Sequence, residues 1–110
     1  MTEETQIYGK LIHLQTAGPG QTFLLAASVV TIGRSEDNDI TLPDKKISGR
    51  HARLECDETG CTIVDTNSTN GTFVNDMQIF TLTLRPGDVI RLGNSHLRFE
   101  TITPPKPASH

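Results

Sequence analysis

HARLECDETGCTIVD, residues 51–65, is the stretch of this chain that decides its fold class. In its first part, Ala52, Leu54 and Cys56 alternate with polar residues, and this period of two is typical of a strand with one buried face. A short acidic loop that ends in Gly60 leads into a second apolar run, which is a signal for a hairpin. The stretch therefore predicts two antiparallel strands, residues 51–56 and 61–65.

Short runs of the same kind recur on both sides of this hairpin, separated by turns rich in Gly, Pro and Asn. No stretch of a dozen residues has the apolar spacing of a helix. Strands that follow one another about every ten residues are typical of a β-sandwich. We therefore predict an all-β fold, an antiparallel β-sandwich, with further strands at residues 7–14, 22–27, 29–32, 40–42, 72–74, 78–84, 89–92 and 96–102.

The length of the chain sets its domain organisation. Its 110 residues suit one domain, because two smaller cores would each be only marginally stable. The ending TPPKPASH has three prolines and no strand pattern, so it cannot join a sheet. We expect a flexible N-terminal tail at residues 1–6, a sandwich domain at 7–102, and a Pro-rich tail or linker at 103–110.

Composition and charge exclude several classes of partner. Hydrophobic residues make up 35% of the chain, which is enough for a core, but no apolar run is long enough to span a membrane. The formal net charge of -3 argues against a general nucleic-acid binder, which needs an excess of Lys and Arg. The acidic N-terminus lacks the apolar stretch of a signal peptide. We expect a cytoplasmic protein, and nothing in the sequence requires more than a monomer.

Cys56 and Cys61 lie at the two ends of the hairpin loop. A metal site needs more ligands, and no His or second Cys pair lies at ligand spacing nearby. We therefore expect two small buried thiols, no metal and no cofactor. A disulfide is the less favoured alternative, since it fits poorly with a reducing compartment.

The unusual chemistry lies in three turns, at residues 33–35, 45–51 and 67–72. Loops at one end of a sandwich converge, and binding residues are often found on such loops. If these three turns meet, they bring together the guanidinium of Arg34, the hydroxyls of Ser48 and Thr69, an Asn amide and two lysines. Such a site has several donors for an anion and no positioned base.

A phosphate ester suits this set of donors. Arg34 offers a planar fork for paired hydrogen bonds to phosphate oxygens, and hydroxyls can donate to the remaining oxygens. The amide of Asn70 can bridge the backbone of a bound peptide. Each hydrogen bond to a charged group contributes about 1.5–3 kcal/mol. Three or four of them, less the costs of ordering and desolvation, correspond to micromolar affinity, about 8 kcal/mol.

Four motifs resemble those of the forkhead-associated (FHA) domain family. They are IGR at residues 32–34, S-x-x-H at 48–51, STNGTFVN at 68–75 and L-x-x-G-D-x-I-x-L-G at 84–93. Each motif alone occurs by chance, but all four in this order are specific, and together they cover about residues 7–102. The chain is thus similar to members of this family, and in particular to bacterial ones.

The resemblance implies an eleven-stranded β-sandwich whose loops bind phosphothreonine peptides. On this basis Arg34 and Ser48 would hold the phosphate. Thr69 would line the site and Asn70 would hold the peptide main chain. Structural support would come from Gly33, His51 and Gly71. The implied function is that of a signalling adaptor that reads phosphorylation by Ser/Thr protein kinases on partner proteins.

The sequence departs from the family pattern at Gly49. Many members carry a basic or polar residue directly after the motif serine, where it adds a phosphate or peptide contact. Arg50 or Lys46 are the candidates to replace that contact here. The family also tends to read the residue three places after the phosphothreonine near the position of Lys46, which suggests a preference for Asp or Glu there.

Two other functions are alternatives to phosphothreonine binding. One is a phosphate-independent interaction or assembly domain that uses a sheet face, as some members of the family do. The other is an enzyme such as a phosphatase, which we reject, because it needs a nucleophile with an activator or a pair of metal ions. We expect no catalytic residue in this chain.

Overall fold

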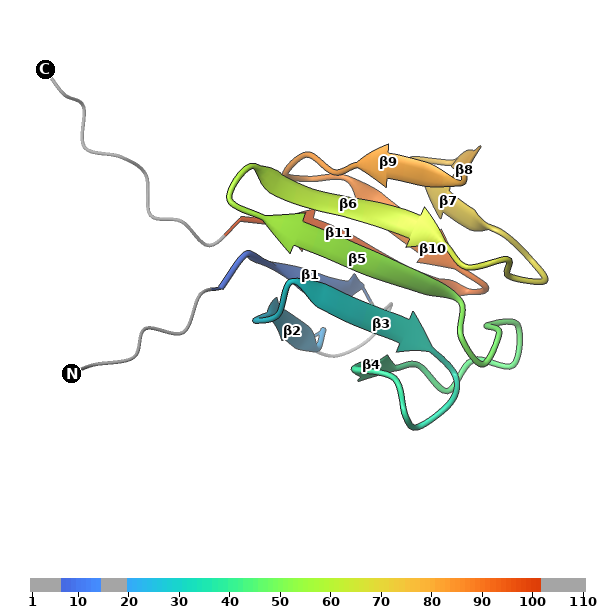
Figure 1. Ribbon diagram of the computed structural model, residues 1–110. Helices are drawn as coiled ribbons and strands as arrows, with labels where there is room; N and C mark the ends of the chain where they lie inside the picture. The colour runs from blue at the N-terminus through green and yellow to red at the C-terminus, as the bar shows by residue number, and fades with distance from the viewer. Residues whose placement is uncertain (1–6, 15–19, 102–110) are drawn as a thin grey trace, which may run out of the picture.

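The structure is a computed structural model that describes residues 7–14 and 20–101, arranged as two β-sheets packed face to face (Figure 1). Within these residues there is no helix, and so none that could cross a membrane. The predicted tails at 1–6 and 103–110 lie outside the described residues. The strands are β1 (Gly9–Leu14), β2 (Thr22–Leu25), β3 (Val29–Gly33), β4 (Ile40–Thr41), β5 (Ala52–Asp57), β6 (Gly60–Asp65), β7 (Thr72–Val74), β8 (Met77–Ile79), β9 (Thr81–Thr83), β10 (Val89–Leu92) and β11 (Ser95–Glu100).

The all-β sandwich predicted from the sequence is confirmed, with one correction to its pairing. One sheet has the strand order β2-β1-β11-β10-β7-β8, and the other has the order β4-β3-β5-β6-β9. The pair β3–β4 is parallel, with Ile32 opposite Ile40, so the sandwich is not wholly antiparallel. The reason is that the loop at residues 34–39 folds back beside β3 before β4 begins, so both strands run in the same direction (Figure 1).

The hairpin predicted at residues 51–65 is present as β5 and β6. Leu54 lies opposite Ile63, and Cys56 lies opposite Cys61 with their Cα atoms 4.0 Å apart. The two cysteines form a disulfide, so the prediction of two free thiols is wrong. The cause is the register of the hairpin, because directly opposed residues point to the same face and their sulfur atoms meet.

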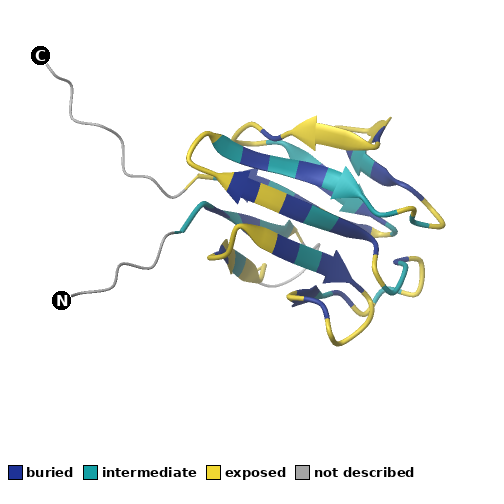
Figure 2. Cartoon of the chain, in the orientation of Figure 1, coloured by how far each residue is buried: buried dark blue, intermediate teal, exposed yellow. Residues whose placement is uncertain are grey.

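The core is built mainly from aliphatic side chains, together with Phe99 and the two cysteines. Along β5 buried residues alternate with exposed or half-buried ones, and along most of β6 they alternate with half-buried ones (Figure 2). Burial of such side chains is the main source of stability of a sandwich. The largest fully buried aliphatic side chains are Leu11, Leu25, Ile32, Leu42, Ile47, Leu54, Ile63, Ile90, Leu92 and Leu97.

The predicted strand at residues 78–84 is two strands that belong to different sheets. β8 pairs with β7 in the larger sheet, and β9 pairs with β6 in the smaller one. The chain crosses between the sheets at Phe80. Before β8, Asn75 and Asp76 form the predicted tight turn, both with positive φ, which is the backbone that two-residue hairpins favour.

The loops β3–β4, β4–β5 and β6–β7 all lie at the same end of the sandwich (Figure 1, right). The β5–β6 hairpin lies at the opposite end. The three polar turns of the sequence are therefore neighbours in space, although residues 34 and 70 are far apart in the chain.

Candidate functional site

Backbone hydrogen bonds join the β3–β4 loop to the β4–β5 loop. The N–H of Arg34 donates to the carbonyl oxygen of Ser48 at 3.0 Å, and the N–H of Ser35 donates to that of Gly49 at 3.1 Å. A Cβ atom on Gly33 would lie 2.2 Å from the carbonyl oxygen of Gly49. Only glycine at position 33 permits this approach, which brings Arg34 beside Ser48.

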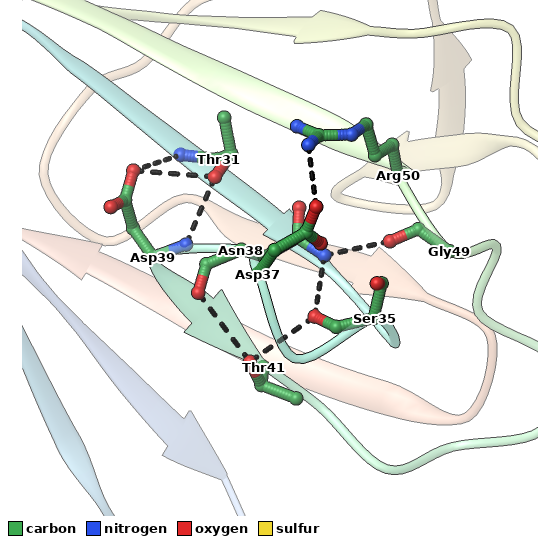
Figure 3. Close-up of polar contacts among 8 residues, drawn as sticks. All are labelled: Thr31, Ser35, Asp37, Asn38, Asp39, Thr41, Gly49 and Arg50. Carbon is green, nitrogen blue, oxygen red and sulfur yellow. Dashed lines mark hydrogen bonds and ion pairs between the residues drawn. The ribbon is translucent and has the colours of Figure 1, made fainter.

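Asn38 is a second link between the same loops (Figure 3). Its side chain is buried, and its Nδ2 atom donates to the carbonyl oxygens of Ser35 and Gly49, both at 2.7 Å. Beside it, the Asp39 carboxylate accepts from the backbone N–H of Thr31 at 2.9 Å. Sequence analysis did not single out Asn38, and a single polar residue in an acidic loop gives no signal that it is buried.

His51 joins the β4–β5 loop to the β6–β7 loop. Its ring is fully buried, and Nδ1 accepts the backbone N–H of Ser48 at 3.0 Å. The ring hydrogen must therefore lie on Nε2, which donates to the carbonyl oxygen of Gly71 at 2.8 Å. Gly71 has a φ of 91°, a conformation that side chains rarely adopt. The neutral His51 thus fixes the relative position of the two loops.

The side chains of Ser48 and Asn70 also connect these loops. Ser48 Oγ accepts the backbone N–H of Thr69 at 3.0 Å, and Asn70 Nδ2 donates to the carbonyl oxygen of Lys46 at 2.7 Å. Because Ser48 Oγ accepts from the protein, its own hydrogen remains to be donated to a bound anion. The structure therefore brings Arg34, Ser48, Thr69, Asn70 and Lys46 together at one end of the sandwich.

Asp65 organises the β6–β7 loop and was not found from the sequence. Its carboxylate accepts from the hydroxyls of Ser68 at 2.5 Å and Thr72 at 2.6 Å, and from the N–H groups of Asn67 and Ser68 at 3.0 and 3.1 Å. Burial opposes ionisation, but these hydrogen bonds outweigh it and hold the pKa of Asp65 below its usual value. An Asp followed by Asn and Ser is a turn signal that could have indicated this role.

The charge of Arg34 is not neutralised by its neighbours in sequence. Arg34 is exposed and forms no ion pair among the described residues. Asp37 pairs instead with Arg50, at 2.7 Å (Figure 3). A hydrogen bond from Ser35 and the charge of Arg50 lower the pKa of Asp37. Arg34 therefore has its positive charge available for a ligand, whereas the guanidinium of Arg50 is already engaged.

Gly49 has open space beside it. The nearest atom to an added Cβ would be the Cβ of Ser35 at 3.8 Å, and φ is not in the left-handed region. Nothing in the backbone therefore requires glycine at this position. There is therefore room for a larger side chain here.

Asp44 connects the β4–β5 loop to the β10–β11 turn. Its carboxylate accepts the N–H groups of Lys46 at 2.9 Å and Asn94 at 2.8 Å, and the hydroxyl of Ser95 at 3.2 Å. Burial works against ionisation of Asp44, but the hydrogen bonds from Lys46 and Asn94 lower its pKa. An open cavity of about 550 Å³ lies here, lined by His13, Pro43, Asp44, Lys45, Lys46, Asn94 and Ser95.

These contacts define what the site can do chemically. It presents a free guanidinium, a hydroxyl whose hydrogen is available, and an amide held at a fixed place, all on loops tied by buried hydrogen bonds. Preorganised donors of this kind bind an anion with little cost of reordering. In the part of the chain that the structure describes, no group of three or more His, Cys, Asp and Glu could hold a metal ion.

Comparisons with known proteins agree with this geometry. The sequence model of the FHA domain matches residues 30–93. The FHA domain-containing protein FhaA of Mycobacterium tuberculosis is 41% identical over 80 residues, which cover 73% of this chain and 15% of FhaA. The glycogen accumulation regulator GarA of Mycobacterium tuberculosis is 35% identical over 95 residues, which cover 84% of this chain and 59% of GarA.

A solved structure from a structural and functional analysis of phosphothreonine-dependent FHA domain interactions is also similar. It matches with a TM-score of 0.77 and 35% identity, over 86% of this chain and 98% of that one. The chain spans less than two thirds of FhaA and of GarA. The FHA match includes the loops with Arg34, Ser48 and Asn70, and it extends over more than half of the sequence. The chain therefore belongs to the FHA domain family.

Proposed function

We propose that this domain binds phosphothreonine-containing segments of partner proteins and acts as an adaptor for Ser/Thr kinase signalling. The observation that supports the proposal is the hydrogen bond from Arg34 N–H to the Ser48 carbonyl, which joins the backbone of an arginine without an ion pair among the described residues to that of Ser48. The similar structure from work on phosphothreonine-dependent FHA interactions supports the choice of ligand.

Each residue of the site has a proposed role. Arg34 and Ser48 hold the phosphate, and Thr69 lines the phosphate site. Asn70 is held by the Lys46 carbonyl and keeps its amide oxygen for the N–H of a peptide. His51 supports the loops through the hydrogen bonds of its two ring nitrogens. Gly33 and Gly71 supply the backbone geometry.

Three residues have secondary roles in the proposal. The Lys46 ammonium favours an acidic residue three places after the phosphothreonine. Gly49 leaves the phosphate with one contact fewer than in many relatives. Arg50 reaches the ligand only if it leaves Asp37, so its contribution is small. Two phosphopeptides with Asp or Ala three residues after the phosphothreonine measure the effect of Lys46. Equal affinities of the two peptides would exclude the preference for an acidic residue.

The proposed domain is a reader and catalyses nothing. GarA, one of its relatives, is named as a regulator, which supports a role in regulation. For phosphopeptide binding we propose a monomeric domain in the cytoplasm. It would bind neither a nucleic acid nor a membrane. Incubation with a phosphothreonine peptide should release no inorganic phosphate.

Calorimetry with one peptide in phosphothreonine, phosphoserine and unphosphorylated forms tests the proposal. We expect micromolar binding of the first form only. Arg34→Ala should weaken it by about 3 kcal/mol, roughly a hundredfold, because the phosphate loses its main charged partner. The matched control is Arg85→Ala, an exposed arginine in the β9–β10 turn. A folded Arg34→Ala protein that binds as tightly as the wild type would refute the proposal.

The alternative is a phosphate-independent interaction domain that uses a sheet face. It predicts that the unphosphorylated peptide or partner competes equally and that Arg34→Ala has no effect. The same calorimetric series therefore separates the two functions.

A further inference from the structure

Asn70 and Gly71, in the β6–β7 loop, form a chemically labile pair. Of the five asparagines of the chain, Asn70 alone is followed by glycine. Asparagine is a thermolabile residue, and a glycine after it hinders attack on its side chain least, because glycine has no Cβ. Asn70 is also exposed, so water and hydroxide reach its side chain. The loop of the proposed phosphopeptide site therefore contains the asparagine of this chain that is most open to spontaneous chemistry.

The geometry of the loop explains why a less labile pair does not stand here. Gly71 has a φ of 91°, and an added Cβ would lie 2.8 Å from Nε2 of Gln78. Asn70 donates its Nδ2 hydrogen to the Lys46 carbonyl at 2.7 Å, which an ionised Asp could not do. Both members of the pair are therefore required by the structure that positions them.

The folded loop holds both of the nitrogen atoms that would react. Cyclisation requires the backbone nitrogen of Gly71 to reach Cγ of Asn70, but its N–H donates to Ser68 Oγ at 3.0 Å. The Ser68 hydroxyl is itself fixed, because it donates to the Asp65 carboxylate at 2.5 Å. The Gly71 carbonyl accepts from Nε2 of His51 at 2.8 Å. The nitrogen that would leave, Nδ2 of Asn70, is held as well. Cyclisation therefore requires the loop to open.

We propose that Asn70 is a site of spontaneous deamidation, that the hydrogen bond from Gly71 N–H to Ser68 controls its rate, and that the product no longer binds phosphopeptide. The Gly71 N–H gives its proton to hydroxide, and its nitrogen forms a bond to Cγ of Asn70. The Cγ–Nδ2 bond breaks, and Nδ2 takes up a proton from water and leaves as ammonia. Water then opens the cyclic imide at either of its carbonyl carbons, which gives aspartate or isoaspartate.

The effect on binding rests on the proposed function. An aspartate at this position has no hydrogen for the Lys46 carbonyl, and its negative charge would lie beside a phosphate dianion. Isoaspartate places Cβ in the main chain, which moves the Gly71 carbonyl away from His51. Both products therefore damage the site that the two loops form. Opening of the β6–β7 loop thus leads to an irreversible loss of phosphopeptide binding.

Incubation of the whole protein at mildly alkaline pH tests the proposal. Mass spectrometry of its proteolytic fragments, with separation of the aspartate and isoaspartate forms, measures the rate at Asn70. A synthetic peptide of residues 64–76 gives the rate in the absence of the fold. We expect the reaction to be at least roughly tenfold slower in the folded protein than in the peptide, because hydrogen bonds at both nitrogen atoms must open first.

Two variants test the role of Ser68. Ser68→Ala removes the acceptor of the Gly71 N–H and should raise the rate at Asn70 by roughly fivefold or more. Thr72→Val is the matched control, since the Thr72 hydroxyl donates to the same Asp65 carboxylate at 2.6 Å but forms no hydrogen bond with Gly71. It should leave the rate close to that of the wild type. Circular dichroism checks that both variants fold, and the comparison with the peptide depends on neither.

Equal rates at Asn70 in the folded protein and in the peptide would overturn the proposal, as would equal rates in the two folded variants. Asn70→Asp should weaken binding of a phosphothreonine peptide by roughly a hundredfold. Wild-type affinity of Asn70→Asp would overturn the claim about the product. The rates need no phosphopeptide, so they stand even if the proposed function fails, and Arg34→Ala tests that function with Asn70 intact.

Discussion

Arg34 and Ser48 are neighbours because of backbone contacts, and the Arg34 side chain takes no part in these contacts. The N–H of Arg34 bonds to the Ser48 carbonyl, while Gly33 and Asn38 pack against Gly49. The guanidinium is thus free to act on a ligand without a structural role. At the scale of the residue, Arg34 therefore has no supporting role, whereas Ser48 and Asn70 also join the β4–β5 loop to the β6–β7 loop.

The support can be tested at Gly33. In Gly33→Ala the new Cβ would lie 2.2 Å from the Gly49 carbonyl oxygen, so the two loops must move apart. We expect a loss of about 1–3 kcal/mol in the free energy of unfolding, measured with urea, together with weaker phosphopeptide binding. Gly49→Ala is the matched control for stability, because its Cβ enters open space. Equal stability of the two variants would contradict this account.

The binding role can be tested by adding a side chain at Gly49. Since the position has room and lies beside Arg34 and Ser48, Gly49→Arg should donate to the phosphate. One more hydrogen bond to a charged group contributes about 1.5–3 kcal/mol before the cost of ordering the side chain, so we expect roughly tenfold tighter binding. Calorimetry at low and high salt measures it. Unchanged affinity for the phosphorylated peptide would show that residue 49 lies outside the phosphate site.

At the scale of the element, the strands were predictable and the contacts between loops were not. Alternation of polar and apolar residues located β5 and β6, and the Asn75-Asp76 turn followed from turn chemistry. The break at Phe80 was missed, because an exposed aromatic residue inside an apolar run looks like part of a continuous strand. The roles of Asn38 and Asp65 depend on which loops meet, and local pattern does not carry that information.

Asp65 makes the stability of the β6–β7 loop depend on pH. Its pKa in the folded state is depressed, since hydrogen bonds from Ser68 and Thr72 outweigh the effect of burial. The unfolded state binds the proton at its ordinary pKa of about 3.9, so the stabilisation is fully present above that pH. It is lost as the pH falls further, through the folded-state pKa.

Unfolding free energies of the wild type and Asp65→Asn at several pH values between neutral and acidic measure this contribution. Near neutral pH the substitution should cost about 1–3 kcal/mol, because an amide cannot accept all of the hydrogen bonds of the carboxylate. The difference between the two proteins should shrink as the pH falls through the pKa of Asp65. A difference that stays constant down to low pH would show that the charge of Asp65 is unimportant.

At the scale of the whole molecule, the disulfide and the binding loops lie at opposite ends of the sandwich. The disulfide of Cys56 and Cys61 closes the β5–β6 hairpin at one end, and the loops with Arg34 and Asn70 lie at the other (Figure 1). Reducing compartments keep such thiols apart, so in such a compartment the domain would have to fold without this bond. The hydrogen bonds that join the three loops do not involve either cysteine, so we expect the site to tolerate a change of redox state.

Reduction of the disulfide should therefore lower stability and leave binding unchanged. The two cysteines are only 5 residues apart in sequence. The loop they close is short, and loop-closure entropy then gives a stabilisation of about 2 kcal/mol. Urea unfolding with and without a reductant measures this loss, and calorimetry under the same two conditions should give equal phosphopeptide affinities. A large fall in affinity on reduction would mean that strain passes along β5 and β6 to His51, and the two ends of the sandwich would then be coupled.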